Sequence, residues 1–430
     1  MSKETINNMR PDHDKIKLRI PKGEKEKLLQ YAGEHGYTLN ALICDAIAQY
    51  RHTLDGAVKE PMSEIYLSDG IISDRIHPNL YNQYGYTVVS LYPGMGSMCL
   101  AFAHEGYNVL KAYEEDHAAC KLFRDSFTSG RLSEGDLSRI DLETVPRADV
   151  LISGFPSITV PEGADHFDAF NHYETVVTNI VNVLERVRPS FFYLEPDNTE
   201  PFDYINKKDH TAAEDMKEYL YTLLKERLTD LHFSLTERSF QALDWTPLPL
   251  SGRKRYLIAV SEDFGPNTVF DEPIPVYKSK PAVKLIYNHN KLDSFFYYRR
   301  DLEFDRSVIA SVKSRNNLYL VRDGKVYDCP GGMCPALTDT MINKRNTVAL
   351  MDDFGGRQLT PCEFLMFKGF HAGFRFSQEL LLEDRYRLAG GSATVPVTRA
   401  IAQRIKSCIR NKKLQVNSAS LKGDLTDGNC

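Results

Sequence analysis

Apolar strand-like runs alternate with helical stretches between residues 86 and 260, and this alternation constrains the fold of the 430-residue chain more than any other feature. The runs are rich in β-branched and aromatic residues, as buried strands are. They are Thr87–Leu91, Asn108–Ala112, Val150–Ser153, Phe191–Leu194 and Arg255–Val260. Parallel strands require crossover connections that are usually helices, so this order predicts an α/β fold with a doubly wound sheet.

Net charge and cysteine spacing exclude several classes of protein. The net charge is −5, so no global positive field attracts nucleic acid, and any DNA contact must come from local basic patches. The 8 cysteines form no CxxC pair and no zinc spacing, which predicts reduced thiols and no metal site. Residues 1–14 lack the apolar core of a signal peptide, and no apolar run approaches the ~20 residues that span a bilayer. We therefore expect a soluble cytoplasmic protein.

Residues 15–52 form a small separate unit. Apolar and cationic residues alternate strictly over residues 15–20, which places the cations Lys15, Lys17 and Arg19 on one face of a strand. Two short helical stretches follow this strand. Because one strand and two short helices cannot bury a core alone, we expect the unit to pair with a second copy of itself.

This order of elements resembles a ribbon-helix-helix domain, in which two chains pair their strands and lay the ribbon in the major groove of DNA. The resemblance implies that Lys15, Lys17 and Arg19 face DNA and that the chain is a homodimer. The alternative is an amphipathic appendage that only dimerises.

Changes in composition divide the rest of the chain. A segment rich in Ser, Asp and Pro predicts a linker. The alternation of strands and helices is lost after residue 261, and it returns from about residue 345. The predicted segments are a disordered tail at 1–14, the small unit at 15–52, a linker at 53–84, an α/β domain at 85–261, an aromatic and charged region at 262–344, a return to the α/β domain at 345–410 and a disordered tail at 411–430.

Glycines and carboxylates follow the first three predicted strands. Gly94 and Gly96 lie in a turn that opens a helix, where glycine lets the backbone approach a ligand. Glu114 ends the next strand, where a carboxylate can hold a ribose diol. Gly135-Asp136-Leu137 follows a third strand and offers an acceptor for an adenine amino group. The glycines alone could form a bare tight turn, but strand ends of these kinds in this order indicate a nucleotide-type cofactor.

Segments from residue 86 to about residue 406 resemble the DNA (cytosine-5)-methyltransferases. They are residues 90–97, Ser153-Gly154-Phe155-Pro156-Ser157-Ile158, Phe192–Asp197, Ser251–Arg255, Arg357–Glu363 and Tyr386–Val397. The resemblance implies a Rossmann-like methyltransferase sheet, S-adenosylmethionine as cofactor, double-stranded DNA as partner and a place in restriction–modification. The implied cofactor contacts are Tyr92, Gly94, Gly96, Glu114, Asp136, Leu137, Pro156 and Ser392.

The cofactor segments depart from the family at two positions. Ser90 stands where the family has Asp, and Gly390-Gly391-Ser392 stands where it has Gly-Asn-Ser. Both changes remove polar contacts without blocking the pocket, so we still expect cofactor binding.

The family's attacking cysteine is absent, because Pro156-Ser157-Ile158 stands where the family has Pro-Cys-Gln. In that family a thiolate adds to C6 of cytosine while a carboxyl group donates to N3. A serine hydroxyl is far less acidic and needs a neighbouring base, so Ser157 should cost several orders of magnitude in rate. Cys99 and Cys120 fall on predicted helices, where a buried thiol is expected and not a replacement nucleophile.

The remaining catalytic residues are partly retained. Glu195 matches the family glutamate that recognises N3 and the exocyclic amine of a flipped base. Arg253 and Arg255 match the two family arginines, which would hold the base and its phosphate, whereas the family glutamine is Ser251. The alternative for the arginines is a pair of solvated cations that precede a strand.

Two further regions concern DNA. Residues 158–185 contain no Lys or Arg but several carboxylates, which would repel phosphates. Residues 262–328 take the place of the family's target recognition domain, and Arg299 and Arg300 follow a cluster of aromatic residues there, as in nucleic-acid surfaces. A strand in a β core would have a similar composition. The matches at 331–338 and 357–363 are expected to be structural.

Three hypotheses follow. The favoured one is a dimeric, nucleoid-associated DNA-binding homologue of the methyltransferases, a pseudoenzyme with weak or no methyl transfer. The second is an active cytosine-5 methyltransferase that uses Ser157 or an unorthodox nucleophile. The third is related chemistry on another base or with a modified cofactor, with Ser157 activated by a neighbour such as Asp197.

Overall fold

The computed structural model describes residues 20, 22–34, 39, 43, 85–126, 131–155, 166–195, 199–200, 212–242, 248–251, 253–265, 270, 290–315, 317–322, 325–329, 333–370, 374, 376 and 379–423. The chain divides into two units, Met1–Gly56 and Ala57–Cys430. In the first unit, helix α1 (Glu24–Glu34) occupies the first predicted helical stretch. The predicted strand with Lys15, Lys17 and Arg19 lies outside the described residues, so the ribbon-helix-helix unit and its dimer remain predictions.

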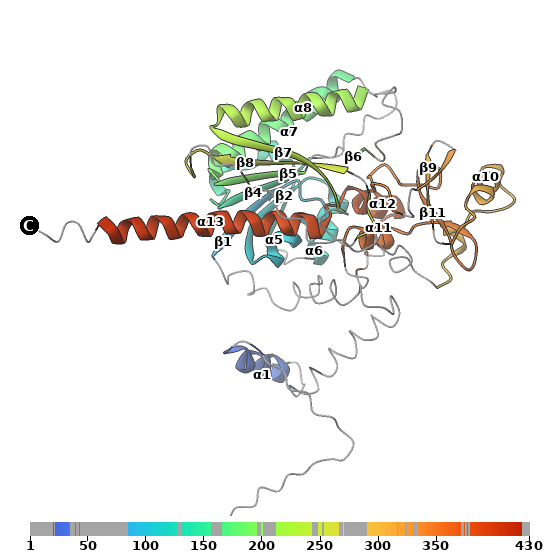
Figure 1. Ribbon diagram of the computed structural model, residues 1–430, viewed down its shortest axis with the longest axis horizontal. Coiled ribbons are helices and arrows are strands. Elements are labelled where there is room, and N and C mark those ends of the chain that lie inside the picture. Colours follow the sequence, from blue (N-terminus) through green and yellow to red (C-terminus); the bar gives the residue numbers. More distant parts are fainter. Residues whose placement is uncertain are drawn as a thin grey trace, which may run out of the picture. The chain divides into compact units, whose positions relative to one another are not determined.

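A large mixed sheet forms the centre of the second unit (Figure 1). Its strands are β1 (Tyr86–Leu91), β2 (Tyr107–Glu114), β3 (Leu132–Glu134), β4 (Val150–Gly154), β5 (Phe191–Glu195), β6 (Thr199–Glu200), β7 (Phe233–Gln241) and β8 (Arg253–Ser261). Their order is β3-β2-β1-β4-β5-β8-β6, and β7 also pairs with β8. The neighbours from β3 to β5 are parallel, whereas β8 is antiparallel to β5, β6 and β7.

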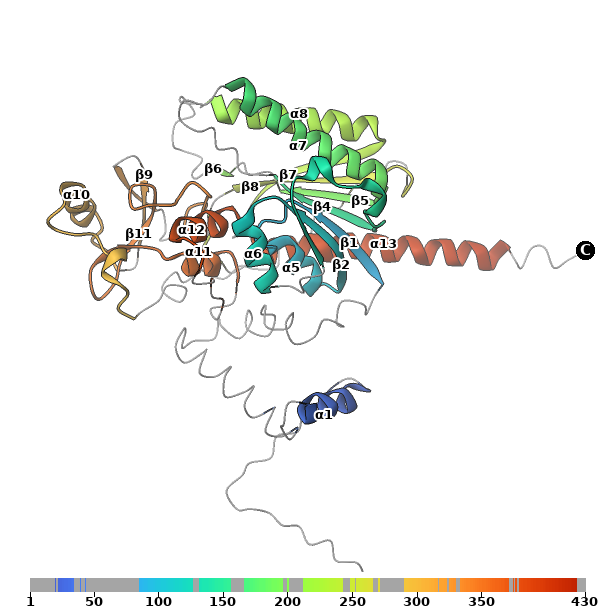
Figure 2. The same cartoon turned by 180° about the vertical axis from the view of Figure 1, so that it is seen from behind.

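Helices cover both faces of this sheet, which explains why its central strands are apolar along their length. Helices α5 (Ser97–His104), α6 (His117–Ser126) and α13 (Val395–Gly423) pack on one face, and α7 (His166–Val187) and α8 (Ala212–Asp230) pack on the other (Figure 2). The two hydrophobic clusters on the two faces take alternate residues of each strand. The α/β fold predicted from the alternating pattern is therefore confirmed.

The parallel register places the carboxyl ends of β1, β2, β4 and β5 side by side at one end of the sheet. Leu91 pairs with Ser153, and Gly154 pairs with Glu195. Loops at the carboxyl ends of parallel strands are the usual place for ligands in such sheets. The predicted cofactor and catalytic residues of these strands thus lie along one edge.

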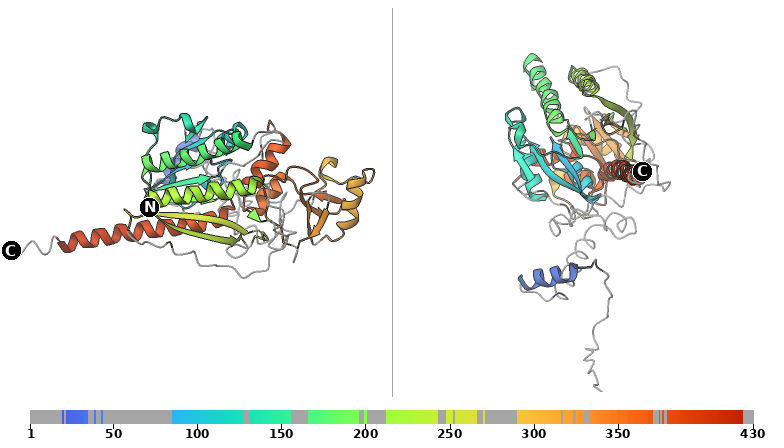
Figure 3. Two further views of the ribbon diagram at one scale, coloured as in Figure 1. Left: turned by 90° about the horizontal axis from the view of Figure 1, so that it is seen from above. Right: turned by 90° about the vertical axis from the view of Figure 1, so that its left-hand side faces the viewer.

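A second, smaller sheet lies beside this edge (Figure 3). Its order is β10-β9-β11-β12, and all its pairings are antiparallel. Its strands are β9 (Leu318–Arg322), β10 (Lys325–Asp328), β11 (Thr347–Met351) and β12 (Gly356–Gln358), preceded by a short 3-10 helix (Ser294–Phe296) and by α10 (Glu303–Ser311). Two helices, α11 (Pro361–Phe367) and α12 (Leu382–Gly391), lie between the small sheet and the large one (Figure 1).

Three features differ from the sequence predictions. Strands β11 and β12 pair within the small sheet, although residues 345–410 were assigned to the return to the α/β domain. The alternative of a β strand at the aromatic cluster does not hold for Ser294–Phe296, which form a 3-10 helix. Helix α13 continues to Gly423, where a disordered tail was predicted from residue 411. No proline or glycine interrupts this helix between Pro396 and Lys422, and extending a formed helix costs little.

Among the described helices, none combines the length and the apolar composition that crossing a membrane requires.

Candidate cofactor and base site

The turn after β1 has the backbone geometry of a close ligand approach. Gly94 and Gly96 have φ angles of 57° and 90°, and Tyr92 adopts a φ of 46° although it is not glycine. The next strand end is equally tight, because a Cβ on Gly154 would lie 2.3 Å from the carbonyl oxygen of Tyr92. Glycine is therefore required at 154, where the β1 and β4 strand ends meet. The sequence prediction placed Gly154 in the active-site loop but did not identify this requirement.

Glu114 ends β2 with a buried carboxylate aimed at backbone donors. Its Oε2 accepts from Gly94 N at 2.8 Å, and its Oε1 accepts from the backbone N–H groups of Glu115 and Asp116 at 2.9 and 3.0 Å. Burial raises the pKa of Glu114 to about 7, although these backbone N–H groups oppose the shift. The carboxylate thus links the glycine turn to the end of β2.

Asp136 and Leu137 follow β3, as predicted, but their side chains differ in role. Leu137 is buried against the sheet, whereas the Asp136 carboxylate accepts from Ser138 N at 2.9 Å and caps a short 3-10 helix (Leu137–Arg139). At the neighbouring strand end, Asp116 pairs with Arg387 of α12 at 2.6 Å. This ion pair fastens α12 against the end of β2.

Ser392 lies at the end of α12, next to the glycine turn. Its hydroxyl donates to Ala389 O at 2.7 Å, and the backbone N–H of the following Ala393 donates to Ser97 Oγ of α5 at 2.8 Å. Gly390 packs so closely that a Cβ there would lie 1.9 Å from Thr338 O. The segment around Ser392 therefore packs over the start of α5, and its contact with the cofactor remains a prediction.

Glu195 and Lys254 form a buried ion pair at the edge of the large sheet. Glu195 Oε1 lies 2.5 Å from Lys254 Nζ, and only 5% and 9% of the two side chains are exposed. Tyr193 OH lies 3.4 Å from Glu195 Oε2, and Lys254 Nζ also lies 3.4 Å from Ser392 O. Since Glu195 is paired in register with Gly154, the ion pair sits beside the start of the loop that carries Ser157. The loop residues Pro156, Ser157 and Asp197 lie outside the described residues.

The sequence prediction missed Lys254 and misjudged the direction of Arg255. Side chains alternate along β8, so Lys254 shares a face with Tyr256 and Ile258, and Arg255 takes the other face. Arg255 Nη1 pairs with Glu218 of α8 at 2.8 Å, and its guanidinium lies over the Tyr221 ring.

The structure thus places Arg255 against α8 and not beside Glu195. Successive side chains of a strand point to opposite faces, so Arg255 faces away from Lys254 and Glu195. The side chain of Arg253 is outside what the structure describes. Parity with the apolar residues that follow in β8 was the sequence signal that could have identified Lys254.

The cysteines near the site are buried and unsuited to attack. Cys99 and Cys120 are both inaccessible, as predicted, and burial raises the pKa of Cys120 to about 12. Cys334 is also buried, and its backbone N–H donates to Pro249 O at 2.7 Å. That bond connects the 331–338 segment to the chain just before β8, so this segment has the structural role that was expected.

A buried ion network supports the small sheet. The Arg357 guanidinium is inaccessible and binds Asp352 Oδ2 at 2.7 Å and both Glu363 oxygens at 2.8 and 2.9 Å. Glu363 Oε2 also accepts from Thr360 N at 2.7 Å, which completes a capping box at the start of α11. The segment Arg357–Glu363 is therefore structural, as its match to the family suggested.

The two predicted DNA contacts of the small region are exposed. Arg299 pairs with Asp301, Arg300 is exposed, and Phe295 in the preceding aromatic cluster is 56% exposed. These positions leave both arginines accessible to a polyanion. Their contact with DNA remains a prediction.

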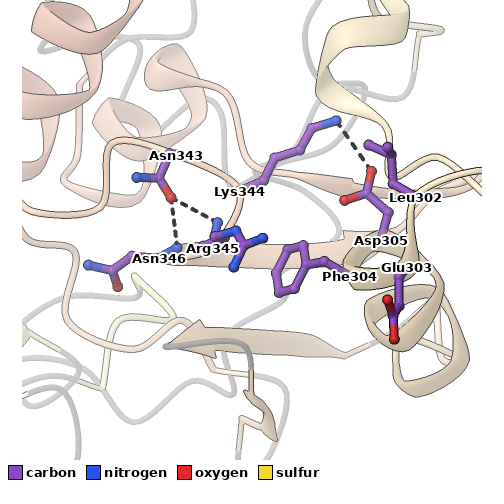
Figure 4. Close-up of a pocket in the computed structure, with 8 residues that line it drawn as sticks. All are labelled: Leu302, Glu303, Phe304, Asp305, Asn343, Lys344, Arg345 and Asn346. Atoms are coloured by element: carbon purple, nitrogen blue, oxygen red, sulfur yellow. Dashed lines mark hydrogen bonds and ion pairs between the residues drawn. The ribbon is translucent and has the colours of Figure 1, made fainter.

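An open pocket of about 630 Å³ lies nearby between α10 and the 343–346 turn (Figure 4). Arg345 lies 4.7 Å from the centre of the Phe304 ring, and Asn343 Oδ1 accepts from Arg345 N at 2.9 Å. Lys344 points towards Asp305 at 4.0 Å, and burial lowers the pKa of this lysine. The pocket presents a stacked guanidinium and amides, but also the carboxylates of Glu303 and Asp305.

Solved structures show the same fold. The S. pombe Dnmt2 methyltransferase superimposes with a TM-score of 0.54 at 14% identity, covering 76% of this chain and 99% of that chain. A prophage-encoded DNA modification methyltransferase from E. coli gives a TM-score of 0.51 at 16% identity, covering 76% of this chain and 100% of that chain. The larger unit therefore has the α/β methyltransferase fold with a mixed central sheet.

Sequence comparison finds similar proteins among the DNA methylases. Residues 86–237 match the model of the C-5 cytosine-specific DNA methylases. The Type II methyltransferase M.Bsp6I of Bacillus sp. (strain RFL6) is 27% identical over 323 residues, covering 74% of this chain and 98% of that protein. M.NgoBI of Neisseria gonorrhoeae is 24% identical over 332 residues, covering 76% of this chain and 96% of that protein. Residues 86–237 thus resemble the C-5 cytosine-specific DNA methylases, and both relatives align with most of the chain at under 30% identity.

The cofactor of this family is S-adenosylmethionine, and the described residues fit it. Gly94 and Gly96 adopt left-handed backbone conformations that favour glycine, and Gly154 lets the end of β4 approach the carbonyl of Tyr92. The Glu114 carboxylate stands at the end of β2, where ribose hydroxyls can donate to it. When bound, the cofactor would supply a methyl group on a sulfonium.

We expect the affinity for S-adenosylmethionine to rise with pH through about 7. The ionised carboxylate of Glu114 is the better acceptor for ribose hydroxyls, and its pKa of about 7 means that it must lose a proton on binding at lower pH. Affinity should therefore fall by up to tenfold for each pH unit below about 7 and level off above about 8. Titration calorimetry from about pH 6 to about pH 8 measures this.

Glu114→Gln should bind the cofactor more weakly and remove most of this pH dependence, whereas Glu143→Gln, at an exposed position, should retain it. The same slope in both variants would show that another group, such as the amine of the cofactor, titrates.

Proposed function

We propose that this protein binds S-adenosylmethionine and duplex DNA and takes an extruded base beside Glu195, with methyl transfer strongly impaired by Ser157. One combination of observations carries the proposal. The residues assigned to the cofactor are largely retained, whereas residues assigned to the base are changed. Gly94, Gly96 and Glu114 keep the geometry that a nucleotide cofactor needs. The attacking position is serine, and the Glu195 carboxylate is paired with Lys254.

An ion-paired carboxylate accepts hydrogen bonds but does not donate them. A serine hydroxyl is a poor nucleophile unless a neighbouring base takes its proton. Both features weaken covalent attack on a cytosine ring, and neither prevents a base from being held. The protein would then act through DNA binding, as a regulator associated with the nucleoid.

Methyl transfer is the second candidate function, because the matched family and the Type II methyltransferase relatives act as DNA methylases. Filter binding with labelled S-adenosylmethionine separates the two. The proposal expects retention of cofactor and DNA with little label in the DNA after the protein is removed.

The homodimer is proposed on the sequence of residues 15–52 and on the division of the chain at Gly56. We expect the full chain to sediment as a dimer and a chain beginning at Ala57 to sediment as a monomer. Loss of the cations Lys15, Lys17 and Arg19 should also weaken duplex DNA binding by about tenfold or more at moderate salt. Sedimentation and fluorescence anisotropy measure the two effects. A monomeric full chain would rule out the ribbon-helix-helix unit.

A further inference from the structure

Lys254 is a buried cation beside Glu195, and the proposed function gives it no role in binding. Its Nζ lies 2.5 Å from Glu195 Oε1 and 3.4 Å from Ser392 O. An ammonium group has three N–H donors, so these acceptors among the described residues leave one donor for a ligand. Lys254 therefore joins the carboxylate proposed to recognise the base to the segment that closes the cofactor site.

The carboxylate and the ammonium have complementary hydrogen-bonding capacities. Ionised Glu195 can only accept, and Lys254 can only donate. The pairing edge of cytosine offers a ring nitrogen, N3, that only accepts, next to an exocyclic amine that donates. A carboxylate alone satisfies the amine and repels the lone pair of N3. The ammonium supplies the donor that this lone pair needs.

The other described cations near Glu195 are directed elsewhere. Arg255 is on the opposite face of β8, paired with Glu218. Lys368 Nζ donates to Ser392 O at 2.7 Å and to Gly390 O, which are backbone carbonyls at the end of α12. Of these cations, only Lys254 contacts the carboxylate beside the Ser157 loop.

We infer that Lys254 determines base recognition by donating a hydrogen bond to the ring nitrogen of the bound base, while Glu195 accepts from its exocyclic amine. The inference rests on the proposed function, because it requires an extruded base beside Glu195. It assigns the ring nitrogen to Lys254 and the exocyclic amine to Glu195, whereas the sequence resemblance assigned both groups to Glu195.

The test compares duplexes that differ in one ring atom. Each carries a single nucleotide opposite an abasic site, where an unpaired base leaves the stack at low cost. The nucleotide is cytosine or 3-deazacytosine, which has C–H in place of N3, and a fully paired duplex is the reference. Anisotropy with the full chain and S-adenosylhomocysteine gives the affinities. We expect the native chain to bind the cytosine duplex about tenfold or more tightly than the 3-deazacytosine duplex.

Lys254→Met should reduce this ratio to about one, because the donor to N3 is gone. Lys225→Met is the matched control, since Lys225 pairs with Glu237 on the opposite face of the sheet and should keep the native ratio. If Lys254→Met does not fold, Lys254→Met/Glu195→Leu removes both charges together and leaves neither buried alone. A melting curve of each variant confirms that it is folded.

A ratio near one in the native chain, or a native ratio in Lys254→Met, would overturn the inference. If either result occurred but the cytosine duplex still bound more tightly than the paired duplex, only the role of Lys254 would be contradicted. The proposed base pocket would still be supported. Equal affinity for all three duplexes would contradict the base pocket itself, and the inference with it.

Discussion

Ser157→Cys is expected to raise methyl transfer from S-adenosylmethionine to DNA by at least about a hundredfold over the native chain. A thiol is partly ionised near neutral pH and its sulfur is soft, whereas a serine hydroxyl needs a base to remove its proton. The glycine turn with Glu114 is retained, and Glu195 stands in register with Gly154 at the start of the loop. Labelled cofactor and genomic DNA that lacks cytosine methylation provide the assay, because such DNA contains every short target sequence.

Ser157→Ala is the matched control and should transfer no more label than the native chain. A Ser157→Cys chain that binds cofactor and DNA but transfers no more than the native chain would contradict the assignment of Ser157 to the nucleophile position. In that case the pairing of Glu195 with Lys254 would be the dominant impairment.

Glu363→Ala is expected to lower the free energy of unfolding by about 3–5 kcal/mol, the largest stability effect of the substitutions considered. The substitution leaves the Arg357 guanidinium buried with only Asp352 as a carboxylate partner, and it also opens the capping box at Thr360. A buried charge that loses its partner costs far more than a surface charge, because no water replaces the lost oxygen atoms.

Denaturant unfolding followed by circular dichroism measures the change. Glu383→Ala is the control, since Glu383 is exposed in the first turn of α12 and should change the free energy of unfolding by no more than about 0.5 kcal/mol. Equal effects in the two variants would show that the Arg357 network does not hold the small sheet to α11.

The fold of the large sheet was accessible from the sequence because its parallel strands are covered on both faces. Runs such as Val150–Ser153 and Phe191–Leu194 are almost entirely apolar and appear in the structure as β4 and β5. The glycine turn and Glu114, both assigned to the cofactor from the sequence, are joined by a hydrogen bond, because strand ends in a parallel sheet meet on one side.

The remaining features depend on contacts that sequence spacing does not encode. Strand β7 was not predicted, because Phe233–Gln241 mixes polar and charged residues at the end of the sheet. Arg255 was assigned to the base because it follows Arg253 in a motif, and only the parity of β8 shows that it turns to Glu218. The ion pair of Glu195 with Lys254 joins residues from different strands, so the sequence around either residue does not predict it.

The central claim is that the protein holds cofactor and DNA but transfers methyl groups poorly. It is tested most directly by measuring label incorporated from S-adenosylmethionine into unmethylated duplex DNA by the native chain and by Ser157→Ala, both at saturating cofactor. The account predicts that both chains bind and that both incorporate label at the same near-background rate. Robust incorporation by the native chain, abolished in Ser157→Ala, would contradict it and establish Ser157 as a working nucleophile.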